Sequence, residues 1–274
     1  MSTKSDITIC IPHWGAERYL KEALQSVSCQ TTRPYEIIIS LDTPISELFL
    51  AELELQKDIR IYENFESGIG KNWNHCIQKV RSHAVVLLHS DDRLDPDYIE
   101  HLTSLIKAYP DYDAWGGNAN IIDESGNSSF TFVDLIKWML SLLVAKSDLR
   151  GDDGLSRVLS ANFIYCPALC YKTKSVKKLM FRTDLRMTLD VDFYSRLLLD
   201  GGAIWYCRRK KYHYRRHLES TSARLTKSGA RFNEEKKLYA ELYVKCLKFG
   251  WSRSRRQAFL LFVPRIHRLL TLLR

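Results

Sequence analysis

The chain has 274 residues, of which 45% are hydrophobic and 27% charged, a composition typical of a globular protein with a large core. No uninterrupted apolar stretch approaches the ~18 residues of a membrane-spanning helix, and we expect no signal peptide because the first residues lead straight into a strand. The seven cysteines are scattered, mostly within apolar segments, which predicts free thiols in a cytoplasmic protein.

Charge is unevenly distributed along the chain. Residues 207–274 carry nineteen Lys or Arg against four Glu, a net +15, whereas residues 1–206 carry 22 against 28, a net −6. Such a basic block attracts polyanions, which makes nucleic acid and anionic lipid the partner classes to consider. The sequence holds no recognition motif of known docking geometry, so we expect no nucleic-acid partner.

Strands and helices alternate four times within the first ~110 residues, which predicts a mostly parallel sheet covered on both faces. The predicted strands cover residues 7–11, 35–41, 59–62 and 84–88, and the predicted helices cover 16–29, 44–56 and 68–81, with Pro96 opening a fourth. The first strand is not followed by Gly-x-Gly-x-x-Gly, which argues against a dinucleotide fold. Residues 68–71 lack the spacing of a Walker loop.

The remaining chain is less regular. Further strands are predicted at 115–122, 166–171 and 203–207, and helices at 132–145, 186–199, 228–248 and 253–273, the last bent at Pro264. The apolar helix at 132–145 is too short to span a bilayer and is expected in the core or an interface. The last two helices are amphipathic and basic. They either lie on an anionic membrane surface or pack on the preceding domain, and the first alternative predicts that truncation near residue 228 spares activity.

Adjacent carboxylates follow the strand at 84–88. In open α/β sheets ligands bind at the carboxyl ends of strands, which is where Asp91 and Asp92 are expected. Two neighbouring carboxylates repel unless a proton or a cation joins them, and a hard divalent cation carrying a substrate diphosphate would remove the repulsion. The simpler interpretation is that both acids cap the following helix.

Two further places in the sequence carry candidate chemistry. Trp14 directly follows the first strand and is able to stack on a nucleotide base, although such an aromatic also serves as a core or rim residue. Asp190 and Asp192 stand two residues apart near the start of a helix and cannot share a face. We expect one of them to point into a cleft while the other caps the turn or pairs with a cation.

Together these stretches resemble the inverting family 2 glycosyltransferases with the GT-A fold. The resemblance covers most of residues 6–222. It rests on Pro12-His13-Trp14, residues 35–42, Asn64 with residues 68–74, residues 89–92 with Pro96, Leu189-Asp190, and Arg216-His217 with Ser220 and Ser222. It implies a GT-A type α/β fold with a mostly parallel central sheet and a basic helical appendage. The expected domains are a catalytic domain at 1–222, with a nucleotide-binding half at 1–120 and an acceptor half at 121–222, and a tail at 223–274.

The resemblance also implies roles for single residues. Asp91 occupies the last position of the family's Asp-x-Asp motif, which binds Mn2+ or Mg2+ on the donor diphosphate, and His217 would complete that site. Asp190 matches the general base that takes a proton from the acceptor hydroxyl. The residues expected to bind or support the nucleotide are Pro12, Trp14, Asp42, Lys71 and Asp92.

Three residues depart from the family pattern, since Leu41, His89 and Leu189 replace acids that are common there. They make a non-catalytic glycan- or nucleotide-binding relative the alternative interpretation. None of them removes the implied metal ligand or base, so we expect an active enzyme. It would move a sugar from a UDP-, dTDP- or GDP-sugar to a glycan or lipid-linked acceptor at the cytoplasmic face of a membrane, in cell-surface polysaccharide synthesis of the O-antigen or capsule type.

Overall fold

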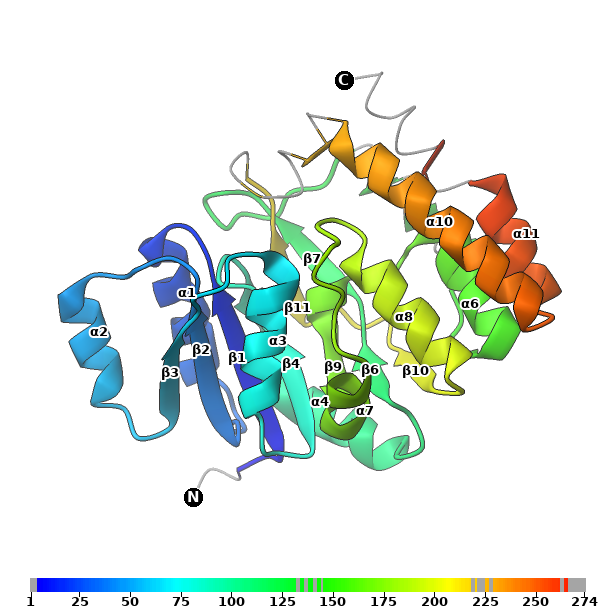
Figure 1. Cartoon of the computed structure of the whole chain (residues 1–274). Coiled ribbons are helices and arrows are strands. Elements are labelled where there is room, and N and C mark those ends of the chain that lie inside the picture. Colours follow the sequence, from blue (N-terminus) through cyan, green and yellow to red (C-terminus); the bar gives the residue numbers. More distant parts are fainter. Residues whose placement is uncertain are drawn as a thin grey trace.

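The computed structural model describes residues 4–131, 134, 135, 138, 139, 142, 143, 145–217, 220, 225, 226, 229–261, 264 and 265. These residues form a mixed α/β fold with an eight-stranded sheet in the order β3-β2-β1-β4-β9-β6-β10-β8. Helices flank this sheet on both sides, and a second sheet of three strands, β5-β11-β7, lies beside it (Figure 1). The expected α/β architecture is confirmed.

The N-terminal half supplies four neighbouring, parallel strands of the large sheet. From the edge inward they are β3 (Ile59–Glu63), β2 (Glu36–Leu41), β1 (Ile7–His13) and β4 (Ala84–Leu87). The accompanying helices are α1 (Glu17–Ser28), α2 (Glu47–Glu54), α3 (Ile69–Lys79) and α4 (Tyr98–Ala108). Both faces of β1 are covered: Cys10 packs in one core layer with Trp73 of α3, whereas Ile9 and Ile11 pack in the other with Leu20 of α1. This two-sided burial explains the continuous apolar run that predicts the strand.

The second half of the sheet is mixed in direction. Its strands are β9 (Leu169–Lys172), β6 (Ala114–Gly116), β10 (Ala203–Tyr206) and β8 (Asp148–Arg150). β9 runs antiparallel to β4 and β6, and β8 runs antiparallel to β10. The other six strands share one direction, which agrees with a mostly parallel sheet. The helical elements of this half are α6 (Gly151–Ala161), η1 (Cys166–Ala168), α7 (Thr173–Leu179) and α8 (Leu189–Leu199).

The prediction of one continuous strand at 115–122 is wrong. The chain leaves the large sheet after β6 and enters the small sheet as β7 (Ala119–Ile122). Gly116 and Gly117 have φ values of 108° and 99°, a left-handed conformation that other residues rarely adopt. β7 then pairs with β11 (Tyr212–Arg215), which also pairs with β5 (Arg93–Leu94). The small sheet therefore brings the chain after residue 211 beside the loop that follows β4.

The described part of the basic tail packs on the domain that precedes it. Helices α10 (Ala230–Lys248) and α11 (Ser252–Leu260) lie against α6 and α8 (Figure 1). The buried side chains of this layer are Leu155, Leu159, Val191, Leu198, Leu238, Tyr239, Leu242, Cys246 and Ala258. Of the two alternatives for the tail, packing on the domain is therefore what α10 and α11 show. Their opposite faces remain exposed, for example at Leu247 and Phe259.

Several expectations fall partly outside the described residues. These are most of the predicted helix at 132–145, the boundary at residue 222, and the predicted continuation of the last helix beyond residue 265. The division into a catalytic domain and a tail stays a prediction. Within the described ranges, no helix combines the length and apolar character that crossing a bilayer demands. All seven cysteines are free thiols, as the sequence predicts.

Candidate functional site

The carboxyl ends of β1 and β4 hold the first group of candidate residues. β1 continues two residues further than predicted, because Pro12 and His13 pair with Ser40 and Leu41 of β2. The next residue, Trp14, exchanges two backbone contacts with the Ser90 hydroxyl, at 3.5 and 3.4 Å. The residue is 42% exposed. The Trp14 indole thus stands at an open rim beside the loop 89–92.

Asp91 is held by a histidine from a distant part of the chain. The Nε2 atom of His217 lies 3.0 Å from Oδ2 of Asp91, so the structure brings together the two residues proposed as metal ligands. Burial favours the neutral acid, but the hydrogen bond with His217 and the electrostatic interaction with the two neighbouring imidazoles, His217 and His89, outweigh it and lower the pKa of Asp91. Asp91 is therefore a carboxylate at neutral pH, the form that binds cations.

His89, Asp91 and Asp92 together could hold a metal ion. One ligand atom of each lies within 4.8 Å of the others. Burial lowers the pKa of His89, which keeps its imidazole in the neutral form that coordinates metals. Among the described residues, Nε2 of His89 is buried and has no hydrogen-bond partner. Imidazole nitrogens beside carboxylate oxygens form a donor set that fits a divalent cation.

Asp92 is fully buried and ties this loop to β11. The Tyr212 hydroxyl donates to its Oδ2 atom and the Arg215 backbone N–H donates to its Oδ1 atom, both at 2.7 Å. Burial, together with the charge of Asp91, raises the pKa of Asp92 well above its ordinary value. Asp92 therefore supports the position of Asp91 from behind, and its direct contact with a nucleotide stays a prediction.

The alternative that Asp91 and Asp92 cap a helix is wrong. Helix α4 begins at Tyr98, and Asp97 occupies its N-cap position. Between Asp92 and that helix the chain forms β5, which pairs with β11 through Leu94. The two acids are therefore turned toward the small sheet and the end of β11, away from the helix start.

Arg215 is the residue of this site that sequence reasoning missed. Its side chain is fully buried, and its guanidinium donates to the Asp91 carbonyl at 2.6 Å, to the Glu124 carbonyl at 2.6 Å and to the Glu22 carboxylate at 2.5 Å. It also lies over the Tyr19 ring at 4.8 Å. Only its place next to Arg216-His217 marks it in the sequence, because every partner is far away along the chain.

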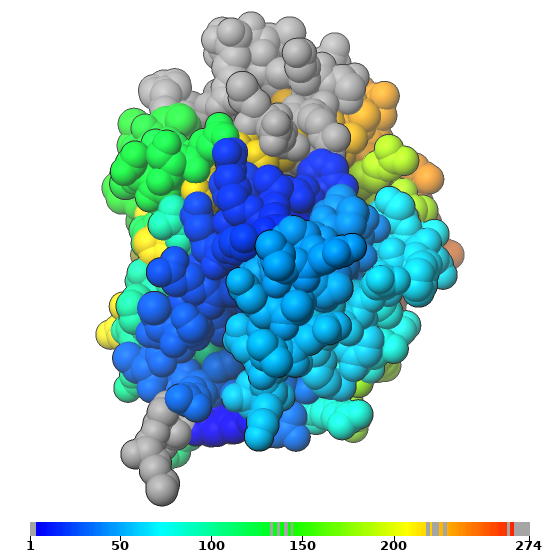
Figure 2. All heavy atoms as spheres, turned by 90° about the vertical axis from the view of Figure 1, so that its left-hand side faces the viewer, coloured from blue at the N-terminus to red at the C-terminus, as the bar shows by residue number. Residues whose placement is uncertain are grey.

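The other candidate nucleotide-binding residues lie at the same edge of the sheet or on α3. Asp42 directly follows β2, where its N–H donates to the His13 carbonyl at 3.0 Å and its Oδ1 accepts from Asn64 at 3.3 Å. Lys71 forms an exposed ion pair with Glu66 at 3.1 Å. Their contacts with a nucleotide stay predictions. Figure 2, which faces the left-hand side of Figure 1, shows that N-terminal residues coloured blue to cyan make most of the surface on that side of the molecule.

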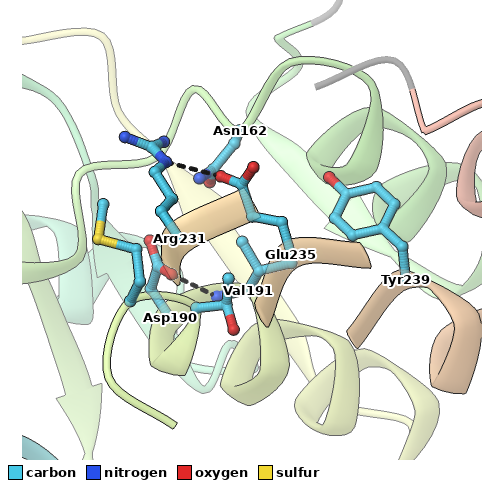
Figure 3. A pocket seen from close by; sticks show the side chains of 8 residues that line it. Asn162, Asp190, Val191, Arg231, Glu235 and Tyr239 are labelled. Carbon is cyan, nitrogen blue, oxygen red and sulfur yellow. Dashed lines mark hydrogen bonds and ion pairs between the residues drawn. The ribbon is translucent and has the colours of Figure 1, made fainter. Parts of the chain in front are cut away.

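Asp190 lines a small pocket of about 50 Å3 between α8 and α10 (Figure 3). The lining residues are Asn162, Met187, Thr188, Asp190, Val191, Arg231, Glu235 and Tyr239. Oδ1 of Asp190 accepts a hydrogen bond from the Val191 N–H at 2.8 Å. Burial raises the pKa of Asp190 to about 6. A carboxylate with a pKa near neutrality is well matched to taking up a proton.

Asp192 points elsewhere, as the spacing predicts. Its side chain is completely buried and pairs with Arg196 at 2.7 Å, while Arg182 lies 3.6 Å away. The positive charges of Arg196 and Arg182 compensate the negative charge of Asp192, whereas Asp190 faces the pocket. Of the two acids, Asp190 is thus the one that lines the pocket, and its role as the base stays a prediction.

Leu189 and Gly70 join the two halves of the molecule next to Asp190. A Cβ atom on Gly70 would lie 2.5 Å from the Arg182 carbonyl oxygen and 3.0 Å from a methyl of Leu189. The start of α3 therefore packs directly on the start of α8, and Leu189 is buried there. This contact explains why an apolar residue stands before Asp190.

Residues 8–144, half of the chain, match the model of the family described as Glycosyl transferase family 2. The chain belongs to this family. The matched residues contain β1 to β7 with Trp14, Asp42 and Asp91, whereas Asp190 and His217 lie beyond them.

Solved structures show the same fold. The structure of TarS residues 1–349 from S. aureus has a TM-score of 0.63 and 13% identity, covering 94% of this chain and 69% of TarS. The complex of that protein with UDP-GlcNAc gives a TM-score of 0.65 at 14% identity, covering 86% and 66%. At this identity the likeness shows the fold alone, and that fold is of the GT-A type.

Curated relatives are more similar in sequence but longer. An uncharacterised glycosyltransferase of Methanocaldococcus jannaschii is 25% identical over 195 residues, which is 66% of this chain and 60% of the relative. The glycosyltransferase GlyA of Streptococcus pneumoniae is 29% identical over 112 residues, 40% of this chain and 16% of GlyA. The chain thus spans 60% of the length of the first relative and a smaller share of the second.

Proposed function

We propose that this chain is a metal-dependent inverting glycosyltransferase that moves a sugar from a nucleotide-diphosphate sugar to an acceptor hydroxyl. The observation that carries the proposal is the pairing of Asp91 with His217 beside His89, at the strand edge where Trp14 is exposed. The TarS structure in complex with UDP-GlcNAc makes that compound the first donor to test.

The metal site would consist of Asp91 and His217, with His89 beside them. Mn2+ or Mg2+ bound there supplies positive charge that stabilises the diphosphate as it leaves the sugar. Arg215 holds the Asp91 carbonyl and Tyr212 holds Asp92, so the loop keeps its shape before any ligand binds. The exposed Trp14 ring would stack on the base.

Asp190 would act as the general base. An acceptor hydroxyl that enters the pocket gives its proton to the Asp190 carboxylate while its oxygen attacks the anomeric carbon on the face opposite the diphosphate. One direct displacement inverts the configuration at that carbon. The polar groups of Asn162, Thr188 and the Arg231–Glu235 pair line the pocket, and they offer donors and acceptors to the part of a glycan or lipid-linked sugar that carries the attacking hydroxyl.

We also propose that the enzyme works at the cytoplasmic face of a membrane, in the synthesis of a cell-surface polysaccharide. The net +15 of residues 207–274 supports this placement, since anionic lipid attracts basic segments. Co-sedimentation with vesicles of phosphatidylglycerol, and none with phosphatidylcholine vesicles, is the expected result. Failure of the protein to co-sediment with phosphatidylglycerol vesicles would contradict the membrane placement and leave the enzymatic proposal intact.

Calorimetric titration with UDP, GDP and dTDP, each with and without Mn2+, tests the site. We expect one nucleotide to bind in a metal-dependent manner, and Asp91→Ala to abolish that binding. Asp111→Ala removes an exposed acid elsewhere and serves as the matched control. Binding that persists unchanged in Asp91→Ala would refute the metal site. Release of UDP from UDP-GlcNAc by the wild type, lost in Asp190→Asn, tests the reaction.

A further inference from the structure

One carboxylate of α10 collects four hydrogen bonds from the turn in front of Asp190. Oε1 of Glu234 accepts from the N–H of Met187 at 2.8 Å, the N–H of Thr188 at 2.8 Å and the Thr188 hydroxyl at 2.9 Å. Oε2 accepts from the N–H of Arg186 at 3.0 Å. Three successive backbone N–H groups thus converge on one side chain, in the way that a backbone nest binds an anion.

This contact fixes the turn that leads into α8, and one of its donors is the N–H of the residue at the N-cap position. Thr188 is the N-cap residue of that helix, and its own side chain makes no capping hydrogen bond to the helix. The first N–H groups of a helix lack partners within it, and a negative charge near them is favourable. Glu234 supplies that charge from a helix more than forty residues later in the chain. The backbone that carries Asp190 is therefore fixed by α10.

α10 also supplies the opposite wall of the pocket. Arg231 and Glu235 stand four residues apart on one face of the helix and form an ion pair at 2.8 Å, with side chains only 15% and 5% exposed. Figure 3 shows both side chains reaching from α10 toward Asn162, across the pocket from Asp190. Two apolar residues of similar size would commonly stabilise a buried site as well or better. A buried ion pair here keeps the pocket polar.

Other contacts hold α10 in place independently of Glu234. Leu238 and Leu242 are buried in the layer shared with α6 and α8, and Glu241 pairs with Arg182 at 2.6 Å. Loss of the Glu234 carboxylate therefore leaves the docking of the helix intact and releases only the turn 186–188. This separation makes a functional test practicable.

We propose that α10 is part of the active site and that Glu234 is the positioning residue of Asp190, which rests on the proposed function of Asp190 as the base. It follows that a chain truncated near residue 228 loses transfer activity, contrary to the expectation that the tail serves only to reach a membrane. The acceptor pocket is complete only with residues outside the segment that matches the family model.

The test compares Glu234→Ala, Glu234→Gln and the matched control Glu241→Gln, which removes a carboxylate from the same helix away from the pocket. Calorimetry measures UDP affinity with Mn2+, and UDP release from UDP-GlcNAc measures turnover. For Glu234→Ala we expect UDP affinity and the donor KM within twofold of the wild type and a kcat at least tenfold lower. Glu234→Gln keeps one acceptor oxygen and should recover part of the rate, while Glu241→Gln stays near the wild type.

Asp190→Asn, measured in parallel, separates the two proposals. Turnover by Glu234→Ala within twofold of the wild type, together with an inactive Asp190→Asn, would overturn the positioning role alone. Wild-type turnover by Asp190→Asn would overturn the base and with it the positioning role. Equal loss of turnover in Glu234→Gln and Glu241→Gln would also contradict the inference, because it would show a general effect of loosening α10.

Discussion

Replacing Asp190 by asparagine is expected to stabilise the protein at neutral pH while abolishing transfer. The folded protein raises the pKa of this carboxyl from its ordinary value of 3.8 to about 6. The folded state therefore holds the proton more tightly than the unfolded chain does. The charge of Asp190 costs nothing below about pH 4, and its cost grows as the pH rises and is complete above pH 6.

A shift of about two pKa units corresponds to about 3 kcal/mol, since one unit is about 1.4 kcal/mol. Asparagine has nearly the same shape, keeps an oxygen for the Val191 N–H and carries no charge. At pH 8 we expect Asp190→Asn to gain about 3 kcal/mol, which is roughly 6 to 12 °C in melting temperature for a domain of this size. Near pH 4 both proteins should melt at about the same temperature.

Circular dichroism melting curves of the two proteins at pH 4 and pH 8 provide the assay, with UDP release measured on the same samples. The wild-type rate is expected to fall below about pH 6, where Asp190 gains its proton. A melting temperature of Asp190→Asn that equals or lies below that of the wild type at pH 8 would refute the argument. A gain of the same size at both pH values would show that the charge is not its cause.

Three further substitutions have definite expected outcomes. Arg215→Met removes the donor of the Asp91 and Glu124 carbonyls and leaves Glu22 with Arg93 as its ion-pair partner; the free energy of unfolding should fall by about 3 kcal/mol, visible in urea titration, and UDP binding should weaken. Gly70→Ala places a methyl 2.5 Å from the Arg182 carbonyl oxygen, and a loss of about 1–3 kcal/mol is expected; an unchanged urea midpoint would contradict that packing. Trp14→Ala should reduce UDP affinity by about tenfold through lost stacking, with the melting temperature nearly unchanged because the residue is 42% exposed.

Local patterns in the sequence predict much of the sheet. The runs around Ile9, Ile38 and Val86 are apolar because both faces of each strand are buried, and this property is visible without the fold. The break between β6 and β7 was not predicted. Trp115 and Ile121 look like parts of one strand, and only the left-handed conformations of Gly116 and Gly117 separate them into two sheets.

In the candidate site, too, some features were predicted from the sequence and others were not. The closeness of Asp91 and His217 was expected from a family resemblance, and the opposite directions of Asp190 and Asp192 from helical spacing. The buried guanidinium of Arg215 and the capping carboxylate of Glu234 could not be predicted, because their partners are defined by tertiary packing. A charged residue in a basic, polar stretch gives no local sign that it will be buried.

The link between Asp91 and His217 spans 126 residues of chain. A loop of that length closes slowly, and on the ribosome it closes only after β11 has emerged. The strands up to β4 are synthesised well before that moment, so the loop 89–92 has left the ribosome before Arg215 and His217 are available to hold it. On the proposed function, donor binding would therefore be the last property that the maturing chain acquires, after its parallel strands have formed.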